Sequence, residues 1–178
     1  MTHHHYKANR PEISIMEVEN TEIVNASQDN FTPKRTVLCA VDNSDCSPNV
    51  VEWAKKNLIP TSDLIVLVNA YKKARPLVGT PVLSYLEVVH KLEEQAQKQA
   101  VKTISFYAQR LTNAGYYVKG VIACGDPRSL IDQQITIQKP DLVVVGSRGL
   151  RGSVQRFVLG SVSQHVVQSS PVPVVVVP

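Results

Sequence analysis

The sequence predicts an α/β fold of the doubly wound kind, a Rossmann-like three-layer sandwich in which a five-stranded parallel sheet lies between helices on both faces. Short runs of aliphatic residues alternate along the chain with longer segments whose apolar residues recur at helical spacing. The short runs are almost continuously apolar, which is typical of parallel strands buried on both faces. Such alternation predicts right-handed crossovers between neighbouring parallel strands.

The first two strands and helices are predicted between residues 35 and 111. The run "RTVLCAVD" (35–42) predicts a strand, because seven residues rich in aliphatic side chains end at an aspartate. Pro48 suits a first helical turn, and apolar residues at helical spacing follow it, so a helix is expected to begin near Ser47. "DLIVLVNAY" (63–71) predicts the second strand. Apolar residues three or four positions apart predict a long helix over 86–111.

The remaining elements follow the same alternation. Gly115 stands where a left-handed residue would end the long helix. An Asp-Pro pair predicts the start of the third helix, because proline is favoured in the first turn. The remaining expected elements are strands over 116–125, 139–146 and 172–177 and helices over 126–138 and 160–170.

Charge and hydropathy divide the chain into a tail and a domain. Residues 1–32 carry two basic and five acidic residues without a clear apolar period, so we expect a mostly disordered or loosely packed acidic tail. Residues 33–178 carry 17 basic and 10 acidic residues and are expected to form one domain. A basic domain favours anionic partners in general.

The cysteines and the apolar runs indicate a cytoplasmic protein without a membrane partner. An odd number of cysteines without a CxxC motif argues against a disulfide framework, so we expect a reducing compartment. Cys39 and Cys124 lie in apolar runs and are expected to be buried in the core. The amino terminus lacks an apolar signal region, and the aliphatic runs are far too short to span a membrane.

The stretch "GSRGLRGSVQRFVLGS" (146–161) follows a predicted strand and precedes a predicted helix. Glycines let backbone N–H groups approach phosphate oxygens closely, and the free N–H groups of a helix start favour an anion. The alternative is a flexible connection whose arginines only face water. The stretch matches neither a Walker A loop nor the GxGxxG dinucleotide pattern.

The candidate residues all follow predicted strand ends. In doubly wound sheets, ligands bind beyond the carboxyl ends of the strands, near the switch in strand order. Asp42, Asn69, Gly125 and the loop that begins at Gly146 are therefore expected at one edge of the sheet. Asp42 could instead serve only as a turn residue, Asp126-Pro127 only as a helix start, and Ser161 only as an N-cap.

Residues 34–178 resemble the universal stress protein family. The resemblance is carried by "VLCAVDNSDCS", "GDPRSLI", "DLVVVGSRGL", "LGSVSQHVV" and the closing "PVPVVVV". It implies a parallel sheet of order 3-2-1-4-5 and a homodimer. The ATP-binding branch has the pattern Gly-x2-Gly-x9-Gly-Ser/Thr, which Gly146, Gly149, Gly160 and Ser161 match except for one additional residue between Gly149 and Gly160.

The resemblance also implies a ligand, ATP, which Mg²⁺ could accompany, and AMP or ADP remain alternatives to ATP. Ala40, Val41 and Asp42 would line the adenosine pocket, Val68 and Asn69 would flank adenine through their backbones, and Gly125 would bound the ribose. Gly146, Arg148, Gly149, Gly160, Ser161 and Val162 would hold the phosphates, with Ser163 assisting.

Three functions are compatible with these observations. The first is a nucleotide-dependent regulatory module of the stress response that acts as a homodimer through the edge strand at 172–177. The second is a slow ATPase, because arginines are available but no strong general-base arrangement can be identified. The third is a dimeric interaction protein that binds no nucleotide. No nucleic-acid partner is expected.

Overall fold

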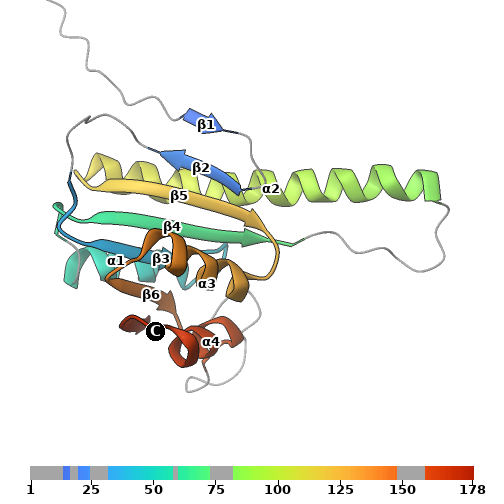
Figure 1. Ribbon diagram of the computed structural model, residues 1–178. Helices are drawn as coiled ribbons and strands as arrows, with labels where there is room; N and C mark the ends of the chain where they lie inside the picture. Colours follow the sequence, from blue (N-terminus) through green and yellow to red (C-terminus); the bar gives the residue numbers. More distant parts are fainter. Residues whose placement is uncertain (1–13, 17–19, 25–31, 58–59, 73–81, 148–158) are drawn as a thin grey trace, which may run out of the picture.

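The aliphatic runs form the centre of a parallel sheet in the computed structural model (Figure 1). The structure describes residues 14–16, 20–24, 32–57, 60–72, 82–147 and 159–178. The strands are β1 (Ser14–Met16), β2 (Asn20–Val24), β3 (Thr36–Ala40), β4 (Leu64–Tyr71), β5 (Tyr117–Cys124), β6 (Leu142–Gly146) and β7 (Val174–Val177). The helices are α1 (Ser47–Asn57), α2 (Val82–Asn113), α3 (Pro127–Gln138) and α4 (Ser161–Ser169).

The expected sheet order is confirmed. From one edge to the other, the parallel strands run β5-β4-β3-β6-β7, which is the order 3-2-1-4-5 for the five predicted strands. β3 lies at the centre and pairs in parallel with both β4 and β6. β4 and β5 are therefore added on one side of β3, and β6 and β7 are added on the other side.

Two additional strands extend the sheet beyond its predicted size. β1 and β2 come from the segment expected to be a tail, and β2 pairs antiparallel with β5, in a register that joins Glu22 to Val121. These strands were not predicted, because the segment shows neither a clear alternation nor a long apolar run. The sheet thus has seven described strands instead of five.

Successive residues of each central strand point to opposite faces, so the sheet supports two separate cores. On β4, Ile65 and Leu67 are buried under α1 and α2, whereas Val66 and Val68 are buried under α3 and α4. Figure 1 shows these two helix layers on either side of the sheet. The expectation of helices on both faces is confirmed.

The helix ends follow local chemistry. Gly115, at φ +86°, ends α2 in the left-handed region that glycine adopts without steric penalty, as the sequence predicts. Asp126 is the N-cap of α3, and its carboxylate accepts a hydrogen bond from the N–H of Arg128. The role of Asp126-Pro127 as a helix start is therefore confirmed.

The core beneath α2 yields a test of stability. Ile104 is completely buried, so Ile104→Ala should lower the free energy of unfolding by about 2–5 kcal/mol, because it removes apolar contacts and leaves a cavity. Ile137 on α3 is 56% exposed, and Ile137→Ala should change stability by no more than about 0.5 kcal/mol. Urea denaturation of both variants measures this; equal losses would contradict the packing described here.

Candidate functional site

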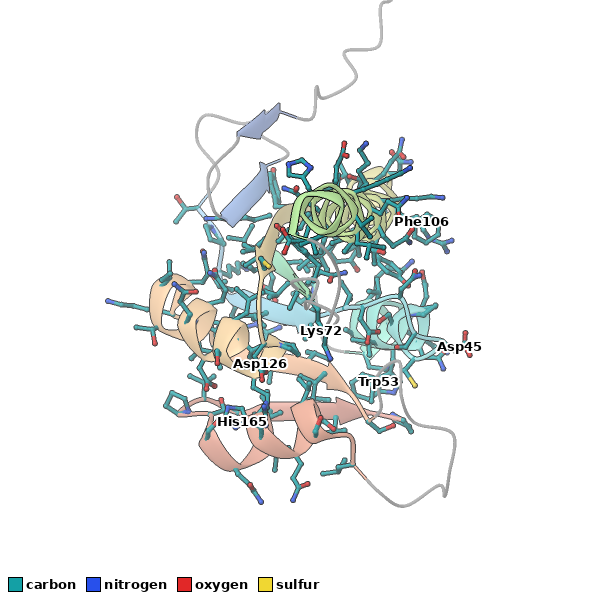
Figure 2. The ribbon with its side chains drawn as sticks, turned by 90° about the vertical axis from the view of Figure 1, so that its right-hand side faces the viewer. Asp45, Trp53, Lys72, Phe106, Asp126 and His165 are labelled. Carbon is teal, nitrogen blue, oxygen red and sulfur yellow. The ribbon has the colours of Figure 1, made fainter. Side chains whose placement is uncertain are left out.

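A cleft of about 650 Å³ opens at the carboxyl ends of the parallel strands. It lies where β3 ends between β4 and β6, and the loops that follow these strands lead to different helices. Figure 2 looks onto this edge of the sheet, with Lys72 near the middle and the helices around it. Lys72 also lines the cleft, so it places a positive charge at the rim.

Most of the predicted site residues meet in this cleft. Gly125 does not line it and is exposed beside the end of β5, with φ +147°. Arg148 and Gly149 lie outside the described residues. The predicted residues that line the cleft are Ala40, Val41, Asp42, Val68, Asn69, Gly146, Gly160, Ser161, Val162 and Ser163.

The loop after β3 is organised by Asp42. Its Oδ1 accepts hydrogen bonds from the N–H and the hydroxyl of Ser44 and, at 2.9 Å, from the hydroxyl of Ser47. The Asp42 N–H in turn donates to Ser47 Oγ at 2.8 Å. Asp42 is therefore a turn residue that also lines the cleft, and its role in binding a ligand stays a prediction.

Hydrogen bonds within the sheet limit the backbone contacts that were predicted for Val68 and Asn69 at the end of β4. The Val68 carbonyl already accepts a hydrogen bond from the N–H of Val41, at 3.0 Å. Asn69 belongs to the ladder with β5, in register with Ile122. The side chain of Asn69 also lines the cleft, so it is a further polar group of this strand end that a ligand could contact.

The start of α4 faces the same cleft. Gly160 is the N-cap, in an extended conformation, and Ser161 is the first helical residue, so the alternative of Ser161 as N-cap is wrong. A glycine N-cap has no side chain with which to cap the first-turn N–H groups. Ser163 holds the turn in place, because its hydroxyl contacts the carbonyl oxygens of Ser147 and Gly160 at 3.1 and 3.0 Å.

The wall formed by α2 was missed by the sequence analysis. Ala96, Gln99, Ala100 and Thr103 line the cleft, and Figure 1 shows the amino-terminal part of α2 extending past the ends of the strands. Their spacing predicted a core-facing helix stripe but gave no motif for a binding site. The small residues Ala96 and Ala100 were the available signal, since they leave space where larger residues would fill a core.

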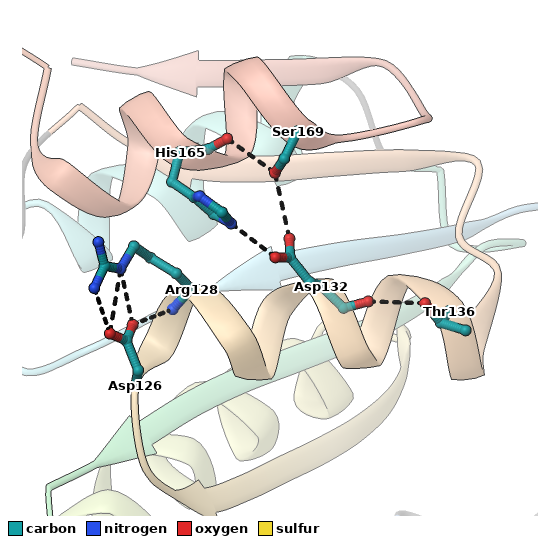
Figure 3. A network of polar contacts seen from close by, with 6 residues as sticks. All are labelled: Asp126, Arg128, Asp132, Thr136, His165 and Ser169. Atoms are coloured by element: carbon teal, nitrogen blue, oxygen red, sulfur yellow. Dashed lines mark hydrogen bonds and ion pairs between the residues drawn. The ribbon is translucent and has the colours of Figure 1, made fainter.

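A polar network joins α3 to α4 beside the cleft (Figure 3). His165 Nε2 lies 2.7 Å from Asp132 Oδ2, and the Ser169 hydroxyl donates to the carbonyl oxygen of His165 at 2.9 Å. The sequence analysis did not identify this partner of His165. The contact ties the helix whose first turn faces the cleft to the helix that supplies Leu130 and Ile131 to its lining.

The cysteines differ from one another in environment. Cys39 is buried as expected, and desolvation raises the pKa of its thiol to about 12, so the thiol stays protonated. Cys124 is exposed, and the expectation that it lies in the core is wrong. Cys124 is the last residue of β5, at the end of the strand.

Within the described ranges, no helix is both long and apolar enough to cross a membrane. The same ranges contain no cluster of three or more histidine, cysteine, aspartate or glutamate side chains suited to a metal ion. Asp42 is the one carboxylate among the described lining residues of the cleft.

Residues 34–178 match the model of the universal stress protein family, and the chain belongs to that family. A universal stress protein of Thermus aquaticus is 30% identical over 143 residues, which cover 80% of this chain and 98% of that protein. A family member from Arabidopsis thaliana, solved with AMP bound, has a TM-score of 0.59 and 20% identity, covering 80% of this chain and 90% of its own. The solved structure of a universal stress protein in complex with cAMP has a TM-score of 0.57 and 24% identity, and the match covers 81% of this chain and 97% of that chain.

The cap of α3 generates a pH-dependent prediction. Hydrogen bonds from the side chain and the N–H of Arg128 lower the pKa of Asp126 to about 2, so the ionised carboxylate stabilises the fold above the ordinary aspartate pKa of about 4. This contribution is lost as the pH falls from about 4 towards 2. Because the group is exposed, we expect Asp126→Ala to cost only about 1 kcal/mol at pH 7.

Denaturation of the wild type and the Asp126→Ala variant at pH 7 and at pH 2.5 or so measures the effect. The difference between the two proteins should shrink at the lower pH. A difference that stayed constant over this range would show that the ionised cap does not contribute.

Proposed function

We propose that the cleft binds an adenine nucleotide, ATP in particular, and that the protein is a nucleotide-dependent regulatory module. The observation that carries the proposal is the union, in one cleft, of the glycine-capped start of α4 and an apolar region between β4 and α2. The first suits phosphate, because its backbone N–H groups face the ligand. The second suits a base. AMP and cAMP bound to solved family members support this assignment.

The spacing of the two regions fits a nucleotide. β6, which leads to the phosphate end, and β4, which leads to the base end, are separated by β3. Two strand spacings amount to about 10 Å. An extended nucleotide can therefore place its phosphates at Gly160 and Ser161 and its base at the end of β4.

We infer that Gly146, Arg148 and Gly149 complete the phosphate end, as their place in the family pattern suggests. The additional residue before Gly160 falls between the two phosphate-binding ends of that pattern. Mg²⁺ would have Asp42 as its protein ligand, through the carboxylate oxygen not engaged by Ser44 and Ser47, and would take its other ligands from phosphate and water.

A regulatory role is favoured over a catalytic one. ATP hydrolysis requires a group that positions or deprotonates water. Asp42, the carboxylate among the described lining residues, has its Oδ1 engaged by three donors of its own loop. We therefore infer that any hydrolysis is slow. The free thiols of the described residues fit a reducing compartment, and we place the protein in the cytoplasm.

The phosphate end can be tested by charge. Ser161→Glu puts a carboxylate in the first turn of α4, where a helix tolerates it well because the N-terminal dipole favours negative charge. The same charge repels the phosphates, so the affinity for ATP should fall about tenfold or more. Equilibrium titration of the full chain with a fluorescent ATP analogue measures the change.

Gln168→Glu is the matched control, because it adds the same charge to an exposed position near the other end of α4. It should bind the analogue like the wild type. Absence of saturable binding to the wild type at millimolar concentrations would overturn the proposal. Unchanged affinity in the Ser161→Glu variant would mean that the phosphates do not bind at the start of α4.

We further propose that the protein acts as a homodimer through the segment 172–177, which contains the edge strand β7. Val143 N–H donates to the Pro173 carbonyl, and Ser147 N–H donates to the Val177 carbonyl, so odd-numbered residues of this segment face β6. Because backbone orientation alternates along a strand, Val174 and Val176 direct their N–H and C=O groups to the open edge. An edge of this kind can pair with the same edge of a second copy.

Val176→Pro tests the dimer without removing a hydrogen bond between β7 and β6. Proline removes the outward N–H and is tolerated in edge strands. The variant should be monomeric by light scattering, whereas Val176→Ala, which keeps the N–H, should remain a dimer. A wild-type monomer, or a dimeric proline variant, would contradict pairing through β7.

A further inference from the structure

Asn69 is a buried amide at the base end of the cleft. Only 6% of the residue is exposed, and it lines the cleft near the carboxyl end of β4. It shares a sheet face with Ile65 and Leu67, which pack in the core beneath α2. The Asn69 side chain therefore lies on the α2 side of the sheet, where every earlier residue of that face is apolar.

The amide of Asn69 makes no side-chain hydrogen bond to any residue that the structure describes, although an amide offers two donors and an acceptor. Buried polar groups are nearly always paired, because an unpaired one forfeits its hydrogen bonds to water. The group also reaches the cleft instead of being sealed in the core. An amide at this depth, without a hydrogen-bond partner among the described residues, is available to a molecule that enters the cleft.

The surroundings of Asn69 suit a flat ring. Across the cleft, α2 contributes Ala96 and Ala100, whose small side chains leave space beside β4. The polar hydroxyl of Thr103 is directed to its own helix, since it donates to the Gln99 carbonyl at 3.0 Å. Small apolar side chains beside a buried amide suit a nucleobase, which has a flat apolar face and a polar edge.

We propose that the side chain of Asn69 reads the edge of the base and makes the cleft selective for adenine over guanine. The inference rests on the proposed function and specifies the substrate of that site. Phosphate fits less well at Asn69, because β6, which leads to the N–H groups at the start of α4, lies two strands away from β4. Ribose links the base to the phosphates in a nucleotide, so it would lie between these two strand ends.

The selectivity follows from hydrogen-bond chemistry. Adenine presents a donor at N6 beside an acceptor at N7, which an asparagine amide matches with its oxygen and its nitrogen. Guanine presents two acceptors, O6 and N7, on the same edge. The amide oxygen would then face another acceptor, so one hydrogen bond would be lost and GTP should bind about tenfold more weakly than ATP.

The test compares ATP and GTP binding to the full chain by isothermal titration. Asn69→Leu keeps the size of the side chain and removes the amide, so ATP loses two hydrogen bonds and GTP loses one, and ATP affinity should fall about tenfold more than GTP affinity. The ratio of the two affinities should approach one. Asn43→Leu is the matched control, because Asn43 also lines the cleft but is exposed, and it should preserve the ratio.

A measurement without nucleotide separates recognition from a structural role. If the amide only supported the fold, Asn69→Leu would lower the thermal unfolding midpoint of the free protein; the proposal expects the midpoint to stay equal or to rise. Equal binding of ATP and GTP by the wild type, or an unchanged ratio in Asn69→Leu, would overturn this inference and leave the proposed function standing. A wild type that bound neither nucleotide would overturn both.

Discussion

The position of β3 at the centre of the sheet is the constraint on which the site depends. β3 pairs in parallel with β4 on one side and with β6 on the other, so the strands that follow it are added in two opposite directions. The chain leaves β3 for α1, which packs on one face, and leaves β6 for α4, which packs on the other. The loops after these two strands separate, and the cleft is the space between them.

This constraint also explains why residues remote in the sequence share the cleft. The end of each parallel strand lies at the same edge of the sheet, so a polar or glycine residue that follows a strand is brought to that edge without any further contact. Asp42, Asn69 and Gly146 meet for this reason. Gly125 lies at the end of β5, which is farther from the switch at β3, and it consequently falls outside the lining.

The sequence could predict the parts of the fold that local patterns encode. The aliphatic runs located all five parallel strands, because a strand buried on both faces has no position that tolerates regular polar residues. Asp126 and Gly115 marked helix ends correctly, since capping and left-handed backbone geometry depend on a few neighbouring residues.

The remaining features depend on tertiary contacts that no local pattern reveals. α2 was predicted as a helix, but its role as a wall of the cleft arises from its length past the strand ends. Cys124 stands in an apolar run yet is exposed at the end of β5, and the run itself does not reveal where the cover of a strand stops. β2 gains its stability from pairing with β5 rather than from its own composition, so the tail gave no strand signal.

The two edges of the sheet differ in a way that bears on assembly. Without β1 and β2, the edge of β5 would be an eight-residue row of open backbone groups, comparable to β7 in its capacity to pair. β2 covers five residues of that edge, and β1, which ends the sheet on this side, is only three residues long. Short edge strands discourage pairing between molecules, whereas β7 is a row of four valines, two of which, Val174 and Val176, direct their N–H groups outward. The amino-terminal strands therefore leave β7 as the better edge for the proposed second copy, and pairing through this edge alone would give one closed, two-fold contact rather than an open chain of molecules paired through both edges.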